Sequence, residues 1–408
     1  MKRLAVVATL LPVALALGFV WWAESAVEVV LCAVVLLQPL AVAALPAERR
    51  RAIAFVQTPA ILLGAFGMAA FVAANMASML GGAIPWGQVV RYAAFVALWI
   101  LALRLAYQAL GALVARALRR EAAAKLVTAV LVVVLGMPQL FVALQTHRFA
   151  IGQQPRLDRA LAELQHVTFE SHDGTPLRGT LVRQPEWSNP RPVVVVCHGV
   201  AANRANVFAY AELAWDLGCH AFAFDFRAHG DSGGATTTLG AREPEDVVAA
   251  CRYLRENGFA QHPIVLVGVS MGGASALRAA ADAGAAAVFA ESAYADLGAM
   301  VEAQVAALGP LRTPAAWAVA VAAWLQLGIS LDEVSPRRSL AALPGDVPVA
   351  LVHAGEDGVI PLAEGRRLAA ARPGLELQVV AGAGHGGCLY VDRARIERLL
   401  RGLVDAVR

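Results

Sequence analysis

The sequence predicts two kinds of structure in one chain: an all-α transmembrane region over residues 1–148, followed by an α/β domain over residues 155–408. Composition is the first observation, because 58% of the 408 residues are hydrophobic and only 16% are charged, against about 45–50% and 25% in soluble domains. Charge is the second, because residues 1–148 hold 12 basic and 4 acidic side chains, whereas the remainder holds 22 and 27. The third is a change of pattern near Pro155, where long apolar stretches give way to short ones separated by Gly, Pro and Asp.

The N-terminal region contains five apolar stretches, each close to the ~20 residues that a helix needs to cross the hydrocarbon core of a bilayer. Basic residues flank them at alternate ends, starting with Lys2 and Arg3 and continuing at residues 49–51 and 116–125. Because loops rich in Lys and Arg stay in the cytoplasm, the alternation predicts a multi-pass protein of the cell membrane, with everything beyond Arg148 outside. The expected spans are Leu4–Trp22, Val27–Leu45, Ile53–Ala74, Trp86–Leu103 and Leu126–Leu144.

A second interpretation takes Met1–Ser25 as a signal peptide, since this segment has a basic start, an apolar stretch and small residues at Ala23 and Ser25. The apolar stretch exceeds the usual length of ~7–15 residues, which favours the five-span prediction. Both interpretations leave the C-terminal domain on the extracytoplasmic side of the membrane.

The α/β domain is predicted from short apolar strands that alternate with helical stretches, a pattern typical of a mostly parallel sheet flanked by helices. Leu164–Glu170 and Leu177–Arg183 are separated by the turn residues Asp173 and Gly174, which predicts a leading hairpin. Later strands are expected at Pro192–Cys197, His220–Phe226, Ile264–Val269, Pro348–His353 and Glu376–Val380, with helices near Asn206–Leu217 and Glu245–Asn257.

A serine with a glycine two positions away on either side follows the expected strand Ile264–Val269, in the order Gly268-Val269-Ser270-Met271-Gly272-Gly273. A tight turn from strand to helix strains the backbone of the serine, and Gly two positions away on either side lets strand and helix approach each other. The turn would present the Ser270 hydroxyl at a helix N-terminus, where amide groups stabilise negative charge. Ser270 is therefore the candidate nucleophile, and Gly268 and Gly272 are its structural support.

Chain order selects the partners of this serine, because the acid and then the histidine follow the nucleophile in proteins built on such a turn. Only His353 and His385 follow Ser270, and His353 lies inside an expected strand. His385 lies in a glycine-rich loop, which makes it the candidate base. The loop after the strand that ends near His353 offers Glu356 and Asp357, of which we predict Asp357 as the catalytic acid. The other histidines are expected at the surface or in turns.

An oxyanion hole needs two amide donors, one from the residue after the nucleophile and one from the loop after an earlier strand. Met271 supplies the first. The sequence His198-Gly199-Val200 occupies the second position, so we assign the second donor to the Val200 amide. His198 and Gly199 are predicted to support the shape of this loop.

With these residues in place, the region from Leu164 to Val407 resembles the serine-hydrolase branch of the α/β-hydrolase superfamily, and within it the serine aminopeptidase-like or BEM46-like hydrolases. The resemblance implies an α/β-hydrolase fold and acyl transfer through a serine. Two residues depart from the pattern, since Ala228 and Ala354 stand where Gly is usual. The matching segments are His172-Asp173-Gly174-Thr175-Pro176-Leu177-Arg178-Gly179, His198-Gly199, Asp225-Phe226-Arg227-Ala228-His229-Gly230-Asp231-Ser232, the Ser270 turn, Asp357–Pro361 and Gly384-His385-Gly386.

Residues 292–344 contain two apolar helical patterns, Leu297–Leu308 and Pro314–Leu327, at the position where this fold inserts a cap. Their apolar side chains, including Trp317 and Trp324, would line an acyl pocket, contact lipid, or simply pack the cap onto the sheet. The expected substrate is accordingly a small-molecule or lipid-like carboxylic ester, and the expected partner is membrane lipid.

Two alternatives remain at this stage: a peptide or amide hydrolase with the same triad, and a non-catalytic membrane protein that only binds or transports a ligand.

The sequence disfavours a nucleic-acid-binding protein, a metalloprotein and a cofactor-dependent enzyme. A net charge of +3 without a long basic run argues against nucleic acid. The five cysteines form no C-x-x-C pair or zinc-type spacing, and phosphate-loop and dinucleotide motifs are missing, so no metal and no cofactor is expected.

Overall fold

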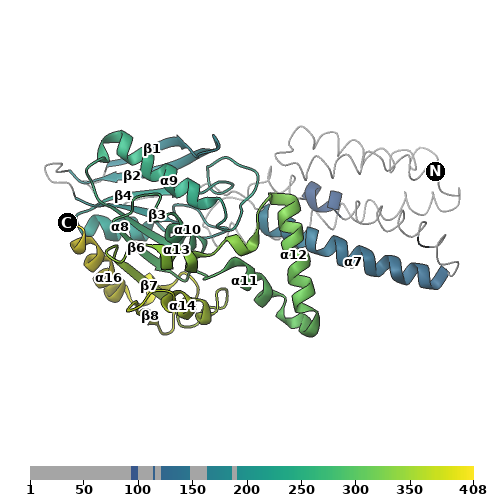
Figure 1. Cartoon of the computed structure of the whole chain (residues 1–408). Helices are drawn as coiled ribbons and strands as arrows, with labels where there is room; N and C mark the ends of the chain where they lie inside the picture. Colours follow the sequence, from purple (N-terminus) through teal and green to yellow (C-terminus); the bar gives the residue numbers. More distant parts are fainter. Residues whose placement is uncertain (1–92, 100–113, 115–120, 148–162, 186–190) are drawn as a thin grey trace. The chain divides into compact units, whose positions relative to one another are not determined.

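The computed structural model describes residues 93–99, 114, 121–147, 163–185 and 191–408. The chain divides into two compact units, one of residues 1–149 with 317–328 and one of residues 150–316 with 329–408 (Figure 1). The first three predicted spans, and most of the fourth, lie outside the described residues.

In the first unit, the fifth predicted span falls on helix α7 (Glu121–Thr146), which contains Pro138. Most of helix α12 (Arg312–Leu327) belongs to the same unit, and the Gln326 side-chain amide donates hydrogen bonds of 2.8 and 2.7 Å to the backbone oxygen and Oε1 of Gln139 in α7. Among the described residues, a single helix with the length and apolar composition to cross a bilayer is not found. One pair of helices, Leu297–Gln304 and Ala306–Leu327, meets both conditions when taken together, with a bend of 104° between them.

The second unit is built on an eight-stranded sheet in the order β1-β2-β4-β3-β5-β6-β7-β8. Strands β1 and β2 form the predicted antiparallel hairpin, β2 pairs antiparallel with β4, and all further pairs are parallel. The apolar patterns predict seven of these strands, all except β6, within a few residues of their observed ends. The eight strands are β1 (Glu163–Glu170), β2 (Pro176–Arg183), β3 (Val193–Cys197), β4 (His220–Asp225), β5 (Ile264–Val269), β6 (Ala287–Glu291), β7 (Val349–Ala354) and β8 (Leu377–Val380).

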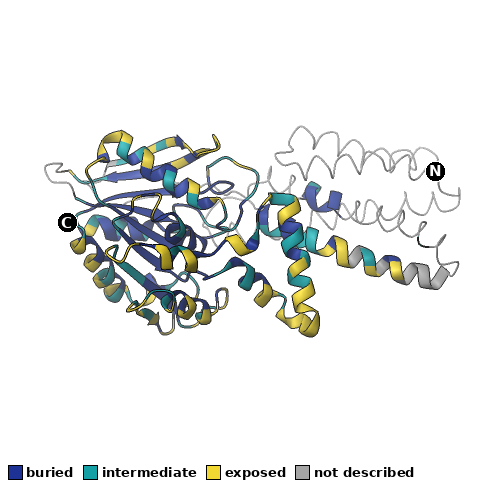
Figure 2. Cartoon of the chain, viewed as in Figure 1, coloured by how far each residue is buried: buried dark blue, intermediate teal, exposed yellow. Residues whose placement is uncertain are grey.

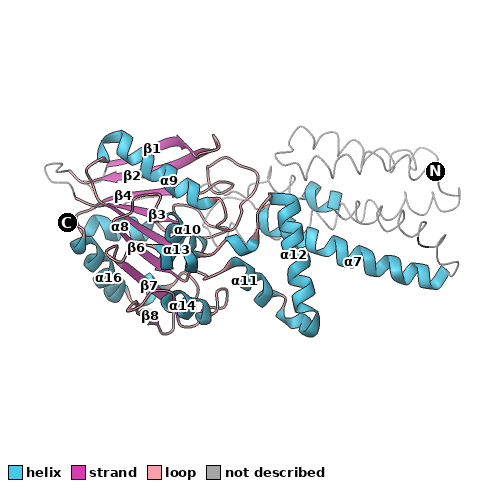
Figure 3. Cartoon of the chain, viewed as in Figure 1, coloured by secondary structure: helices cyan, strands magenta, loops and turns pink. Residues whose placement is uncertain are grey.

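Helices cover both faces of the sheet, which explains why its central strands consist of uninterrupted apolar residues. Every residue of β3, β4, β5 and β6 is buried (Figure 2). Helices α8, α15 and α16 share one core cluster with alternate residues of these strands, while α9, α10, α13 and α14 contact one another over the other face (Figure 3). Their bounds are α8 (Phe208–Asp216), α9 (Glu243–Leu254), α10 (Met271–Ala279), α13 (Pro336–Ala342), α14 (Leu362–Ala369), α15 (Cys388–Val391) and α16 (Arg393–Ala406).

The segment between β6 and β7 contains the two helices expected there, α11 (Leu297–Gln304) and α12, before α13. Its two ends are fastened together, because the Leu297 N–H donates to the Val334 carbonyl at 3.0 Å and the Arg337 N–H donates to the Ala295 carbonyl at 3.1 Å. Asp296 adds side-chain bonds at the same place, accepting from Ser335, Arg337 and Arg367. The insertion therefore leaves and re-enters the sheet through a narrow neck.

Candidate active site

Ser270 sits at the end of β5, at the turn into α10. Its backbone has φ 58° and ψ −122°, a conformation that L-residues rarely adopt. The glycines around it are required by space: a Cβ at Gly268 would lie 2.3 Å from the Gly272 carbonyl oxygen, and one at Gly272 would lie 2.2 Å from the Cys197 carbonyl oxygen. The turn is closed by a hydrogen bond of 2.8 Å from the Ser270 N–H to the Glu291 carbonyl of the neighbouring strand β6.

The structure brings Ser270, His385 and Asp357 together at the carboxyl ends of the parallel strands, although they are far apart in sequence. The distance between Ser270 Oγ and His385 Nε2 is 2.9 Å. His385 Nδ1 lies 2.8 Å from Oδ2 and 3.0 Å from Oδ1 of Asp357. A hydrogen bond chain from hydroxyl to imidazole to carboxylate is therefore in place.

Asp357 is held as a carboxylate by its surroundings. Burial acts to raise its pKa, but the hydrogen bond from His385 and those from the Ile360 and Val359 N–H groups outweigh burial and lower the pKa to about 2. Glu356, the other acidic residue of this loop, is exposed and lies outside the hydrogen bond chain. His353 is buried in β7, where its Nε2 lies 3.0 Å from the Ile360 carbonyl and so supports the same loop.

The loop after β3 lies directly against the serine, because a Cβ placed on Gly199 would be 3.2 Å from the Ser270 Cβ. Val200 follows Gly199 in this loop, and Met271 follows Ser270 as the first residue of α10. Among the described hydrogen bonds outside helices and strands, neither the Val200 N–H nor the Met271 N–H is a donor. These are the two amides that we predict as donors of the oxyanion hole.

His198 is completely buried and holds this loop in shape. Its Nε2 accepts a hydrogen bond of 3.0 Å from the Phe226 N–H, so the ring proton is on Nδ1, which donates to the Gly199 carbonyl at 2.6 Å. Burial lowers the pKa of His198 to about 4, and the ring is neutral at pH 7.

His229 supports the same loop, a role that the sequence analysis missed. Its place in a turn is as expected, since its N–H donates to the Phe226 carbonyl at 3.1 Å, but its side chain is buried, as is that of His220. Its Nε2 accepts a hydrogen bond of 3.2 Å from the Ala201 N–H, and its Nδ1 donates to the Arg227 carbonyl at 2.8 Å. The only signal in the sequence was its place in the matched segment Asp225–Ser232.

The two departures from the family pattern have different structural consequences. Ala228 has a φ of 58°, in the left-handed region where glycine is favoured, which accounts for the usual Gly at this position. Ala354 is the buried last residue of β7, and its φ is not positive. The loop that carries Asp357 is therefore not strained by the alanine.

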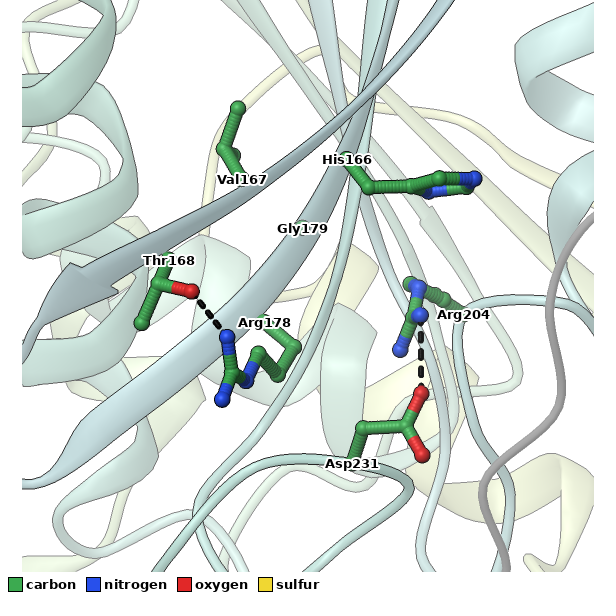
Figure 4. Close-up of a pocket in the computed structure, with 7 residues that line it drawn as sticks. All are labelled: His166, Val167, Thr168, Arg178, Gly179, Arg204 and Asp231. Carbon is green, nitrogen blue, oxygen red and sulfur yellow. Dashed lines mark hydrogen bonds and ion pairs between the residues drawn. The ribbon is translucent and has the colours of Figure 1, made fainter.

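A separate polar pocket of about 360 Å³ lies beside the hairpin β1–β2 (Figure 4). Arg204, at its wall, is already paired with Asp225 and Asp231, and Arg178 donates to Thr168. Ser270, His385 and Asp357 do not line this pocket, and we assign the pocket no part in the chemistry of these three residues. Its lining residues are His166, Val167, Thr168, Arg178, Gly179, Arg204 and Asp231.

Comparison with known proteins supports the α/β fold. The chain is similar to the uncharacterized protein YqkD of Bacillus subtilis, with 28% identity over 211 residues that cover 50% of this chain and 68% of that protein. It is 26% identical over 224 residues to the uncharacterized protein YfhR of Salmonella typhimurium, covering 51% and 69%. The esterase Pf2001 of Pyrococcus furiosus has the same fold, with a TM-score of 0.50 and 21% identity over 63% of this chain and 98% of that one.

The family comparison spans the region that carries the site. Residues 194–399 match the alpha/beta hydrolase family, a stretch that contains β3, the Ser270 turn, Asp357 and His385. It also contains the insertion between β6 and β7. With a match over half of the sequence, the chain belongs to the alpha/beta hydrolase family.

Proposed function

We propose that the protein is a serine hydrolase that cleaves a carboxylic ester through the triad Ser270, His385 and Asp357. The observation that carries the proposal is the unbroken hydrogen bond chain, with 2.9 Å between Ser270 Oγ and His385 Nε2 and 2.8 Å between His385 Nδ1 and Asp357 Oδ2. Such an arrangement activates a hydroxyl that is otherwise a weak nucleophile.

The reaction has two halves. Ser270 Oγ attacks the carbonyl carbon while His385 Nε2 takes its proton, and the oxyanion forms between the amides of Val200 and Met271. His385 returns the proton to the leaving alcohol, which leaves an acyl group on Ser270. Water, deprotonated by His385 Nε2, then attacks this acyl group, the bond to Ser270 Oγ breaks as His385 returns the proton to that oxygen, and the carboxylic acid is released. Throughout, Asp357 keeps the imidazole in the tautomer that accepts at Nε2 and stabilises the imidazolium.

The composition of the insertion within the catalytic unit supports an apolar acyl group. Between Leu297 and Ala316 the only charged residues are Glu302 and Arg312, which lie 3.9 Å from each other. An apolar chain beside this segment would therefore meet few charges. Within the family, we place the chain with the serine aminopeptidase-like or BEM46-like hydrolases on the segments His172–Gly179 and Asp225–Ser232.

Labelling with a fluorophosphonate tests the proposal. The wild-type chain and Ser275→Ala should be labelled, whereas Ser270→Ala should not, because Ser275 lies buried inside α10 and takes no part in the chemistry. Full labelling of Ser270→Ala would refute the assignment. Turnover of nitrophenyl esters of increasing acyl length, beside matched nitroanilides, then separates ester from amide hydrolysis. A preference for the anilides would favour the peptidase alternative.

We also propose that residues 1–148 anchor the enzyme in the cell membrane with the catalytic unit outside. The support is the sequence pattern of five apolar stretches with basic residues at alternate ends. A reporter that is active only outside the cytoplasm should work when fused after Arg408 and fail when fused after Arg120. A cytoplasmic signal from the fusion after Arg408 would contradict five crossings.

A further inference from the structure

Glu291 is a buried acidic residue that the mechanism above does not use. It is the last residue of β6, next to the strand that carries the nucleophile, and its side chain has no exposure to solvent. A buried carboxylate is unfavourable unless its oxygens accept hydrogen bonds. Its contacts therefore indicate what it does.

Three hydrogen bonds converge on Glu291, two of which lead to the catalytic groups. Its backbone carbonyl accepts from the Ser270 N–H at 2.8 Å. Its Oε1 accepts from the Cys388 N–H at 3.0 Å, and its Oε2 accepts from the Tyr210 hydroxyl. One residue thus connects the nucleophile turn to the segment that follows His385.

The bond to Cys388 is close enough to His385 to control its position. Cys388 begins helix α15, three residues after His385, and the Gly387 N–H donates to the Gly384 carbonyl at 2.9 Å, which closes a tight turn around the histidine. If Cys388 shifts, this turn and the imidazole shift with it. A misplacement of about 1 Å costs about 100-fold in rate when reacting groups must be aligned.

Tyr210 keeps the carboxylate in its orientation. The residue lies in α8 on the same face of the sheet as α15, and its side chain is buried. Burial and the adjacent Glu291 carboxylate raise the pKa of the Tyr210 phenol, so the hydroxyl stays protonated and donates. With both oxygens bonded, the carboxylate has a single orientation.

We infer that Glu291 is a positioning residue that fixes the separation of Ser270 Oγ and His385 Nε2, through its backbone on one side and its carboxylate on the other. The inference rests on the proposed serine hydrolase function. Glu291 touches neither substrate nor reacting atoms, and acts through Ser270 and Cys388.

Variants in the full chain test this role by the rate of fluorophosphonate labelling and by kcat and KM for a short ester. Glu291→Met keeps the volume but loses both acceptors, and should lower kcat and the labelling rate by about 10–100-fold with KM little changed. Glu291→Gln should restore both rates to within about fivefold, because its amide oxygen still accepts from Cys388 and its NH₂ donates to the Tyr210 oxygen. Val288→Ala, which weakens β6 without removing a side-chain hydrogen bond, should label at nearly the wild-type rate.

The outcomes separate the inference from the proposed function. If the wild type is neither labelled nor active, the proposed function fails. If the wild type is labelled and folded Glu291→Met is labelled equally fast, or if Glu291→Gln is as slow as Glu291→Met, the positioning role is refuted. Should Glu291→Met fail to fold, Tyr210→Phe decides, since loss of its hydroxyl should slow labelling by about 3–10-fold and a wild-type rate would refute the role.

Discussion

The backbone conformation of Ser270 predicts an unusual ranking of two inactive variants. At φ 58° and ψ −122°, a residue with a Cβ is strained by about 1–3 kcal/mol, whereas glycine is not. Glycine loses about 0.4–1 kcal/mol of this advantage through the greater freedom of the unfolded chain. Ser270→Gly should therefore be more stable than Ser270→Ala by about 0.5–2 kcal/mol.

Ser270→Gly and Ser270→Ala both lose the hydrogen bond to His385, so this loss cancels in the difference between their free energies of unfolding. Thermal unfolding of the full chain, followed by circular dichroism, measures the difference. For a domain of this size the expected gap in Tm is about 1–8 °C, at about 2–4 °C per kcal/mol.

Ser275 provides the matched control. It is also buried in α10, but it lies inside the helix, where its φ is negative. There Ser275→Ala should be more stable than Ser275→Gly by about 1 kcal/mol, the opposite order. If the two pairs rank in the same order, with Ala above Gly at both positions, the strain argument for Ser270 is wrong.

Three further predictions concern the acid, the neutral histidine and the close approach of strand and helix. Asp357→Asn should lower kcat for an ester by about 10⁴-fold by favouring the wrong imidazole tautomer, while Glu356→Gln should leave it nearly unchanged; the reverse ranking would move the acid to Glu356. The pKa of His198 is lowered from 6.5 to about 4 in the fold, so the unfolded chain binds the proton more readily. Its contribution to stability is complete above pH 6.5 and falls by up to about 3 kcal/mol as the pH drops to 4; urea unfolding at a series of pH values checks this, and an equal free energy of unfolding at pH 7 and pH 4.5 would contradict it. Gly272→Ala should destabilise the fold by about 1–3 kcal/mol or more through contact with the Cys197 carbonyl, whereas Gly402→Ala, exposed in α16 with open space around it, should stabilise by about 0.5–1 kcal/mol in the same melts.

Short motifs within a few residues of Ser270, Asp357 and His385 made these three residues predictable from the sequence. The Ser270 turn is specified by glycines within two residues, and the loops of Asp357 and His385 follow apolar strands whose ends are visible in the pattern. Because carboxyl ends of parallel strands meet at one edge, these groups were expected to converge. The structure places the three within hydrogen bonding distance.

The supporting residues could not be predicted in this way, because their roles depend on which strands are neighbours. Glu291 contacts Cys388 across 97 positions of sequence, and no local pattern marks it as different from a solvated strand end. His229, expected at the surface or in a turn, is buried and accepts a hydrogen bond from Ala201 in the loop after β3, a contact that depends on which loops are neighbours. All five predicted membrane spans remain predictions, since the first three and most of the fourth lie outside the described part of the chain and the fifth is shown only as the helix α7.

The narrow neck of the insertion between β6 and β7 allows the sequence of the insertion to change without a change in the register of the two strands. The side-chain bonds of Asp296 and the backbone bonds beside it hold the two ends of the insertion together. These bonds offset the entropic cost of closing the loop, so a longer or shorter insertion puts little strain on β6 and β7. Residues between Leu297 and Val334 can then be shortened, lengthened or exchanged while β6 and β7 keep their register. We propose that this segment is where substrate range changes while the geometry of Ser270, His385 and Asp357 stays the same.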